Sequence, residues 1–260
     1  MTSFSGKTLE AIDYAAELIC KAKHIVALTG AGISTPSGIP DFRSEGKGLW
    51  AKDEPLEVAS QTTFRTHPEK FFEWFRPLAS SIFEAQPNEA HQALAALEQQ
   101  GKLQAIITQN IDILHQKAGS ARVIEMHGTL ATLTCTQCYK KFEYHKYLNA
   151  FIESDLLPHC SICGAILKPD VILFGEQLPQ KAWHEAQAES RKCDLMMVIG
   201  SSLEVLPVAG LPMQAVDRGA HLIIINNSPT YISVRADINI YEDVAHIVPA
   251  ISQLVLNHER

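Results

Sequence analysis

Five short, largely apolar segments recur along the chain, at 25–29, 103–108, 122–125, 195–200 and 221–226. Each has the length of a strand, and their apolar residues run continuously rather than in alternation. Continuous apolar strands are typical of parallel sheets that helices cover on both faces. The pattern therefore predicts five buried parallel strands.

Helical spacing of apolar residues marks the stretches around these segments. In 7–21, for example, Leu9, Ile12 and Ile19 lie on one helical face. The other predicted helices are 67–84, 88–100, 112–118, 180–192 and 207–218. Alternation of strands and helices predicts an α/β fold with a doubly wound parallel, Rossmann-like sheet.

Six cysteines include two pairs with two residues between partners: Cys135 with Cys138, and Cys160 with Cys163. Two such pairs in a chain without a secretory signal indicate one tetrathiolate zinc site. Four thiolates close the coordination shell, so this zinc would be structural. The alternatives are a redox pair, four unrelated thiols, or replacement of one thiolate by His145 or His159. We expect Cys20 and Cys193 to be small core residues.

Two segments interrupt the alternation of strands and helices. Residues 44–86 are rich in aromatic side chains, and residues 131–170 hold the four paired cysteines with little periodic apolar sequence. We expect a helical insertion and a zinc-binding module that form a smaller lobe, with zinc replacing the core that so short a segment cannot build. We also expect the aromatic run at 71–75 to be core. The ranges 1–43, 87–130 and 171–260 would form the Rossmann-like domain.

The charge balance narrows the range of partners. The chain has 22 Lys and Arg against 29 Asp and Glu, a net charge of −7 and a pI near 5.9. This mild acidity gives no electrostatic signature for nucleic acid and is compatible with a lysine-rich partner. No signal peptide or membrane-spanning segment is recognisable. We expect a soluble, cytoplasmic protein.

Polar residues follow each predicted strand, where ligands bind in doubly wound folds. Glycines at 30 and 32 would let backbone N–H groups approach a phosphate, and a second Gly-Ser turn at 200–202 favours a dinucleotide. The oxidoreductase fingerprint G-x-G-x-x-G is absent, because position 35 is Thr. The usual hydride-transfer mode of binding is therefore not expected.

Six motifs in one order resemble those of the sirtuins, the NAD-dependent protein lysine deacylases. They span about residues 7–245 and comprise GAGISTPSGIPDFR at 30–43, TQNID at 108–112 with LHQKAG at 114–119, MHG at 126–128, the paired cysteines, KPDVILFGE at 168–176 and VIGSSL at 198–203.

The resemblance implies that NAD binds as a co-substrate at these strand ends. Phe42 would shield the reactive ribose face, and Asp112 would accept the carboxamide N–H of nicotinamide. The residues expected to contact NAD are Gly30, Ala31, Gly32, Ser34, Asp41, Phe42, Arg43, Gln109, Asn110, Ile111, Asp112, Gly200, Ser201, Ser202, Asn226, Asn227, Ser228 and Val244.

The resemblance also implies a reaction. An acyl-lysine protein or peptide would transfer its acyl group to ADP-ribose, releasing nicotinamide, O-acetyl-ADP-ribose and free lysine. His127 would be the general base, because imidazole has a pKa near neutrality, and Asn110 would be the second catalytic residue. The peptide would pair by β-augmentation with an edge formed by Ile172, Leu173, Phe174 and Gly175.

Three departures from the sirtuin pattern affect this interpretation. Ser201 stands where Thr is frequent, and Ser228 replaces a carboxylate expected at the adenine ribose. Phe75 and Leu78 occupy the positions of a Tyr-x-x-Arg that accompanies succinyl or malonyl specificity. Without that cation we expect neutral acyl groups, acetyl first.

Two other functions stay open at this point: ADP-ribosyl transfer to protein, and a non-catalytic NAD-sensing module that binds partners. The sequence names neither target proteins nor an oligomeric state.

Overall fold

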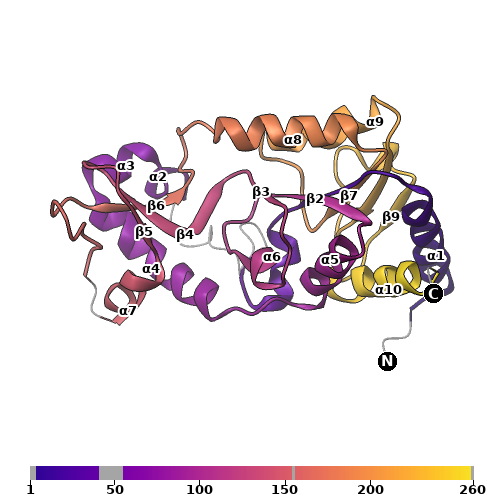
Figure 1. Cartoon of the computed structure of the whole chain (residues 1–260), viewed down its shortest axis with the longest axis horizontal. Helices are drawn as coiled ribbons and strands as arrows, with labels where there is room; N and C mark the ends of the chain where they lie inside the picture. The colour runs from indigo at the N-terminus through magenta and orange to yellow at the C-terminus, as the bar shows by residue number, and fades with distance from the viewer. Residues whose placement is uncertain (1–3, 41–54, 154–155, 259–260) are drawn as a thin grey trace.

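The computed structural model describes residues 4–40, 55–153 and 156–258. Its larger lobe is built on a sheet of six parallel strands in the order β3-β2-β1-β7-β8-β9 (Figure 1). The predicted α/β fold with a doubly wound parallel sheet is confirmed. The strands are β1 Ile25–Thr29, β2 Leu103–Thr108, β3 Val123–Glu125, β7 Leu195–Ile199, β8 His221–Ile225 and β9 Ile238–Ile240.

Helices cover both faces of this sheet. Ala27 of β1 packs into one core, while its neighbours Val26 and Leu28 pack into the other, so the whole strand is buried. This two-sided burial is why the strands are continuously apolar. The first core involves α1 (Gly6–Lys21), α5 (Glu89–Gln99) and α10 (Val244–Asn257), and the second α8 (Gln180–Lys192) and α9 (Leu211–Val216).

Strand β9 and helix α10 lie outside the set of predicted elements. β9 has only three residues with Asn239 at its centre, too short a segment to give an apolar run. α10 buries apolar residues at helical spacing, but Pro249 lies inside it and argues against a helix at the sequence level.

No helix in the described ranges is long and apolar enough to cross a membrane.

The other predicted helices are present with shorter bounds at two places. The segment 112–118 forms only α6, Leu114–Lys117, and 207–218 begins with the 3₁₀ turn η4, Val208–Gly210, before α9. The described residues also form the 3₁₀ turns η1 Ala31–Ile33, η2 Thr35–Ser37 and η5 Ser233–Arg235.

The smaller lobe combines elements from both predicted insertions. A three-stranded antiparallel sheet, in the order β5-β4-β6, packs with helices at the other end of the molecule (Figure 1). The predicted residue boundaries between the lobes stay a prediction. The elements are α2 Pro55–Val58, α3 Gln61–Thr66, α4 Pro68–Glu84, β4 Gly128–Cys135, β5 Lys141–Glu143, α7 His145–Glu153 and β6 Leu167–Val171.

This lobe has an aromatic core of its own. Phe71, Phe72 and Phe75 of α4 are each 1% exposed, as expected for core residues. The ring of Phe71 lies 5.2 Å from Phe72 and 5.4 Å from Phe75, and the cluster extends to Leu133 and Leu167 of the antiparallel sheet. The cysteine segment therefore shares a hydrophobic core with α4. This differs from our expectation that zinc would replace such a core.

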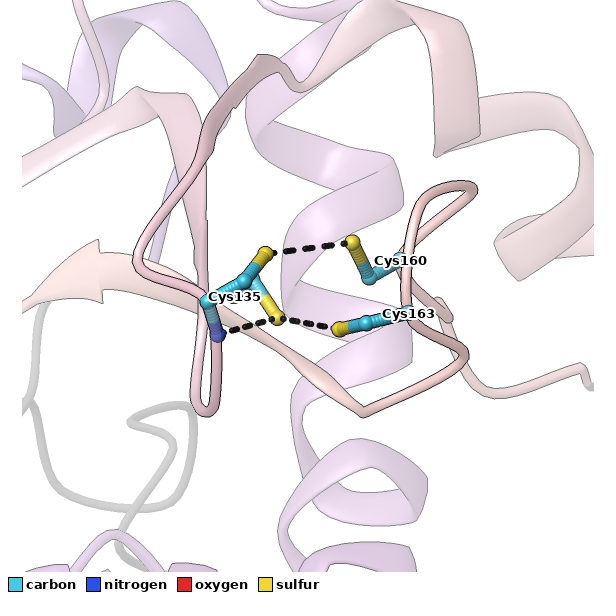
Figure 2. A group of neighbouring side chains, drawn as sticks. Cys135, Cys160 and Cys163 are labelled. Atoms are coloured by element: carbon cyan, nitrogen blue, oxygen red, sulfur yellow. Dashed lines mark hydrogen bonds between the residues drawn. The ribbon is translucent and has the colours of Figure 1, made fainter.

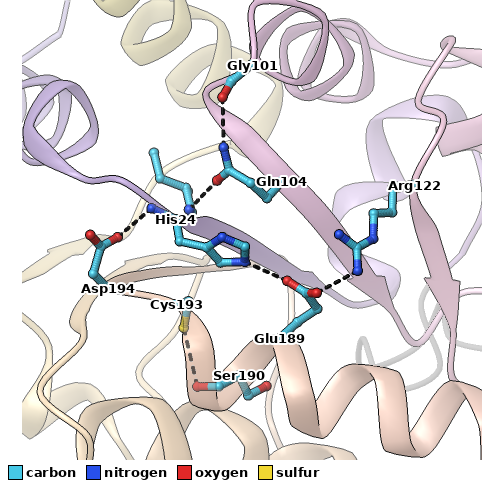
Figure 3. A network of polar contacts seen from close by, with 9 residues as sticks. His24, Gly101, Gln104, Arg122, Glu189, Ser190, Cys193 and Asp194 are labelled. Atoms are coloured by element: carbon cyan, nitrogen blue, oxygen red, sulfur yellow. Dashed lines mark hydrogen bonds and ion pairs between the residues drawn. The ribbon is translucent and has the colours of Figure 1, made fainter.

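At the amino ends of the central strands, two carboxylates hold the sheet to α8 (Figure 3). Glu189 of α8 accepts a hydrogen bond from Nε2 of His24 at 2.6 Å and pairs with Arg122. Asp194 accepts the backbone N–H groups of Lys23 and His24 at 2.8 Å each. Burial alone raises the pKa of Glu189, but the hydrogen bond from His24 and the charge of Arg122 outweigh it, so this pKa lies below its ordinary value.

We therefore predict a pH-dependent effect of Glu189→Gln. A carboxylate whose folded-state pKa is lowered stabilises the fold above its unfolded pKa and loses this contribution as the pH falls. The variant should lower the free energy of unfolding by about 1–2 kcal/mol at pH 7, and by less near pH 4. Urea denaturation of both proteins at the two pH values measures this. Glu185→Gln, at a half-exposed position of the same helix, is the control, and an equal loss at both pH values would contradict the assignment.

Candidate active site

The loops that follow β1 and β7 touch through their backbones. The N–H of Gly32 donates to the carbonyl of Gly200 at 2.8 Å, and that of Gly30 donates to Ile199 at 3.2 Å. A Cβ atom at Gly32 would lie 2.8 Å from the Gly200 oxygen, and one at Gly200, where φ is 61°, would lie 2.3 Å from the nitrogen of Ile33. The two glycine N–H groups therefore join the loops, which differs from the expectation that they approach a phosphate.

Three predicted site residues form one hydrogen-bonded group beside this junction. Ser34 Oγ donates to Asp112 Oδ2 at 2.6 Å and accepts from Asn110 Nδ2 at 3.1 Å. Asn110 Nδ2 also donates to the carbonyl of Gly30 at 3.1 Å. Ser34, Asn110 and Asp112 are 1%, 9% and 4% exposed, so they form a buried polar wall in an otherwise apolar sheet.

Asp112 also binds the backbone at the start of α6. Its Oδ1 accepts the N–H of Leu114, the first residue of α6, at 2.9 Å. Burial raises the pKa of Asp112 above its ordinary value, and the hydrogen bonds from Ser34 and Leu114 oppose that rise. Both carboxylate oxygens thus accept bonds within the chain, so Asp112 orders the start of α6 in addition to any ligand contact.

The ends of β2, β7 and β8 are joined by a second set of side-chain bonds. Ser201 N donates to Asn226 Oδ1 at 2.8 Å, and Asn226 Nδ2 returns a bond to the Ser201 carbonyl at 2.6 Å. Gln109 Nε2 reaches across β1 to the hydroxyl of Ser201 at 2.8 Å. The hydroxyl group of Ser201, at a position where the sirtuin pattern often has Thr, therefore accepts a hydrogen bond from Gln109.

His127 is oriented by a backbone carbonyl. Its Nδ1 lies 2.9 Å from the Gln109 oxygen, and because a carbonyl only accepts, Nδ1 carries the proton. The other ring nitrogen, Nε2, is then the basic atom of the neutral ring. Burial lowers the pKa of His127, and the bond to Gln109 opposes the change. The ring is thus neutral at pH 7, as a general base requires.

The predicted peptide edge begins one hydrogen bond away from this histidine. Ile172 N donates to the His127 carbonyl at 2.9 Å, and Phe174 N donates to the Ala59 carbonyl at 3.0 Å. Leu173 is buried and its N–H donates to Glu176, whereas Phe174 is 40% exposed. The N–H groups of these three residues are occupied, which leaves Gly175 as the backbone N–H of this edge to be offered to a peptide. The peptide contact itself stays a prediction.

The remaining predicted residues lie around the same strand ends. Ala31 and Ile111 are half-buried, Ser202, Asn227 and Ser228 are exposed, and Val244 is buried at the start of α10. Asp41, Phe42 and Arg43 lie outside the described residues. Their predicted contacts with NAD stay predictions.

A buried chain of hydroxyl groups was not among the predicted site residues. His115 Nε2 lies 2.9 Å from Thr29 Oγ1, which donates to Thr108 Oγ1 at 2.9 Å. Thr108 in turn accepts the N–H of Asn110 at 3.1 Å. His115 therefore packs in the interior and bonds to Thr29. The signal for the threonines was their place as the last residues of β1 and β2.

The four paired cysteines converge at one point of the small lobe, where Figure 2 shows Cys135, Cys160 and Cys163. Their sulfur atoms all lie within 4.8 Å of one another, with 3.4 Å between Cys135 and Cys163 and 3.7 Å between Cys138 and Cys160. A tetrahedral zinc with sulfur ligands at about 2.3 Å holds them about 3.8 Å apart, so the cluster fits one zinc ion.

Backbone N–H groups favour the thiolate of Cys135, whereas the pKa values of Cys138 and Cys163 are raised, because contacts with the neighbouring cysteines and burial outweigh their backbone hydrogen bonds. Burial raises the pKa of Cys135, but the N–H groups of Cys138 and Gln137 outweigh it and lower that pKa to about 6. Ile162 N makes the equivalent contact with Cys160 at 3.4 Å. Neither His145 nor His159 is part of the cluster, in agreement with a site of four thiolates.

Comparison with known proteins identifies the family. The model of the Sir2 family matches residues 30–207, which include both glycine loops, His127 and all four cysteines. The NAD-dependent protein deacylase 2 of Archaeoglobus fulgidus is 45% identical over 242 residues, covering 93% of this chain and 94% of that protein. This chain belongs to the Sir2 family.

Solved structures agree with the Sir2 assignment. A structure from work on the mechanism and regulation of Sir2 enzymes has a TM-score of 0.88 at 44% identity and covers 96% of this chain and 99% of that one. A Sir2 complex with a p53 peptide and NAD⁺ has a TM-score of 0.83 at 38% identity, with 95% and 98% covered. The resemblance drawn from the motifs is therefore confirmed.

For the cysteine cluster of this Sir2 protein we predict that zinc removal unfolds the smaller lobe. Treatment with a chelator, or Cys135→Ser, should increase amide hydrogen exchange in β4–β6 and α4 by orders of magnitude, because four bonds to the ion would hold the two cysteine turns together in addition to the pairing of β4 with β6. Cys20→Ser, outside the cluster, is the control. Protection of β4–β6 that persists after complete metal removal would show that the aromatic core holds the lobe alone.

Proposed function

We infer that this Sir2-family chain is an NAD-dependent protein deacylase, and we propose that it acts first on acetyl-lysine. The observation that carries the proposal is the orientation of His127: its Nδ1 is bound by the Gln109 carbonyl, so Nε2 is left as the base. This base lies between the polar strand ends of the large lobe and the segment that begins at Ile172.

The residues at the strand ends fit NAD. Ser34, Asn110, Asp112, Ser201 and Asn226 are buried polar groups at the carboxyl ends of parallel strands, the position where such sheets bind nucleotides. Asn110 and Asp112 would hold the nicotinamide half, and Ser201 and Asn226 the adenosine half. When bound, NAD supplies the ribose carbon that accepts the acyl oxygen as nicotinamide departs.

The role of His127 follows from its surroundings. A proton must leave the ribose diol for the acyl group to move from lysine to ADP-ribose. A neutral imidazole can accept that proton directly, because its Nε2 does not first have to lose a proton of its own. The lowered pKa of His127 keeps the base neutral at pH 7. Its partly buried position limits competition from water.

The acyl-lysine peptide would bind along the segment after β6. Backbone recognition gives affinity with little dependence on sequence, which suits an enzyme that reads lysine in many contexts. Gly175 is exposed and has a φ of 87°, and a Cβ atom there would meet no atom within 4 Å. It therefore leaves room for an approaching backbone.

The acyl preference rests on the small-lobe helix α4. Phe75 and Leu78 are 1% and 4% exposed within the aromatic cluster, so these positions supply no cation for a dicarboxylate tail. Arg76 of the same helix is directed to α7, where its Nε donates to the Phe151 carbonyl at 2.8 Å. A charged acyl tail would lose hydration here without gaining a partner, whereas an acetyl group would not.

We predict that His127→Ala removes turnover but not NAD binding. The value of kcat/KM should fall by at least about 100-fold, the usual contribution of a general base, while the Kd for NAD by calorimetry changes little. In the wild-type protein the acidic limb of kcat/KM should lie below about pH 6.5. His184→Ala, at an exposed position on α8, is the control. Wild-type turnover in His127→Ala would refute the assignment.

The acyl preference is tested by mass spectrometry of acetyl-, succinyl- and myristoyl-lysine peptides, with and without NAD. We predict NAD-dependent loss of acetyl with stoichiometric nicotinamide and O-acetyl-ADP-ribose, and succinyl loss at least about tenfold slower. Succinyl cleavage at the acetyl rate would contradict the role of α4. Adenylate-labelled NAD ending covalently on protein would indicate ADP-ribosyl transfer instead, and NAD binding without any turnover would indicate a sensing module.

A further inference from the structure

An ion pair lies directly beneath the predicted peptide edge. Lys168 of β6 and Glu176, which follows the edge, approach to 3.0 Å between Nζ and Oε2. Their side chains are 22% and 17% exposed. The two residues flank the segment 169–175 in sequence, so the pair joins the last residues of strand β6 to the end of the predicted edge and closes 171–175 into a loop.

Both charged groups also bind the backbone of that loop. Lys168 Nζ donates to the carbonyl of Val171 at 2.7 Å. The same carboxylate oxygen of Glu176 accepts the N–H of Leu173 at 2.9 Å. Hydrogen bonds to charged groups are stronger than those between neutral groups, so both ends of the loop are held by charge-assisted contacts.

The loop then turns under this constraint. Glu176 N donates to the Leu173 carbonyl at 2.9 Å, and Gly175 adopts a left-handed conformation with a φ of 87°. The neighbouring bonds from Ile172 to His127 and from Phe174 to Ala59 attach the same loop to the base and to the segment before α3. The direction in which Gly175 offers its backbone is thus determined by the Lys168–Glu176 pair.

The pair is partly buried and lies outside the aromatic core. It lines a shallow hollow of about 360 Å³ together with Gln61, Asp170 and Ile172. Asp170 has partners of its own, since it accepts from Thr132 and Thr134 and pairs with Lys141. The charges of Lys168 and Glu176 are therefore directed to the loop and not to the packing of the lobe.

We propose that Lys168 and Glu176 are positioning residues that set the affinity for the acyl-lysine peptide by holding the 171–176 loop in its binding conformation. Neither residue is among those expected to contact NAD or the reacting atoms. The inference rests on the proposed function, in particular on peptide binding along the segment 172–175. Loss of the pair would leave a loop that must be ordered again each time a peptide binds.

The test is steady-state kinetics of Lys168→Met and Glu176→Ala with an acetyl-lysine peptide. We expect the KM for peptide to rise about tenfold, while kcat and the KM for NAD stay within about twofold. Lys168→Arg should restore most of the affinity, because it keeps the charge. The double variant should be no weaker than the single ones, since either change breaks the same loop closure.

Two controls separate this role from a merely structural one. Lys141→Met breaks the neighbouring pair with Asp170 and should leave every kinetic constant unchanged. In hydrogen exchange without any peptide, the Leu173 amide should exchange about tenfold faster in Glu176→Ala, with the amides of β4 unaffected.

The outcomes distinguish this proposal from the proposed function. An inactive wild-type protein on every acyl peptide would refute the deacylase function. Two results with an active wild-type protein would refute the positioning role alone. One is an unchanged peptide KM in Lys168→Met. The other is a Lys168→Met protein in which kcat and thermal stability fall and both KM values change together. Unchanged exchange at Leu173 would do the same.

Discussion

The candidate site depends on the close approach of the loops after β1 and β7. Gly32 and Gly200 meet through their backbones, and a single Cβ atom at either position would overlap the other loop. This contact brings the polar ends of neighbouring strands within hydrogen-bond distance, so that Asn110 can bind Gly30 and Gln109 can reach Ser201. Strand pairing alone places the ends of parallel strands on one edge of the sheet. The contact between Gly32 and Gly200 also brings the loops after β1 and β7 together at that edge.

Gln109 connects this site to the smaller lobe. Its N–H continues the pairing of β1 and β2, its amide binds Ser201, and its carbonyl orients His127. His127 is in turn bonded to the segment after β6, because its own carbonyl accepts the N–H of Ile172. The base is thus placed by backbone groups of both lobes.

The smaller lobe uses two means of stabilisation. Helix α4 supplies stacked phenylalanine rings, and the cysteine cluster joins the turns after β4 and before β6. The strands β4, β5 and β6, which carry or adjoin the cysteine pairs, are too short to bury much surface alone. Their apolar residues, such as Leu133 and Leu167, find a partner only because α4 folds onto them. The packed lobe in turn holds strand β6, which carries Lys168 and leads into the loop that ends at Glu176.

The sequence alone determined the class of the fold, the four thiolates and the family, because buried strands, CxxC spacing and contiguous motifs are local patterns. Only the tertiary structure decided which groups bind one another: the bonding of Gly32 to Gly200, the carbonyl that orients His127, and the ion pair of Lys168 with Glu176. Strand β9 and helix α10 escaped prediction because three residues and an internal proline carry little local signal. A pattern can show which residue types are present, but the partner of each N–H and each charge depends on which backbone segments the folded chain brings into contact.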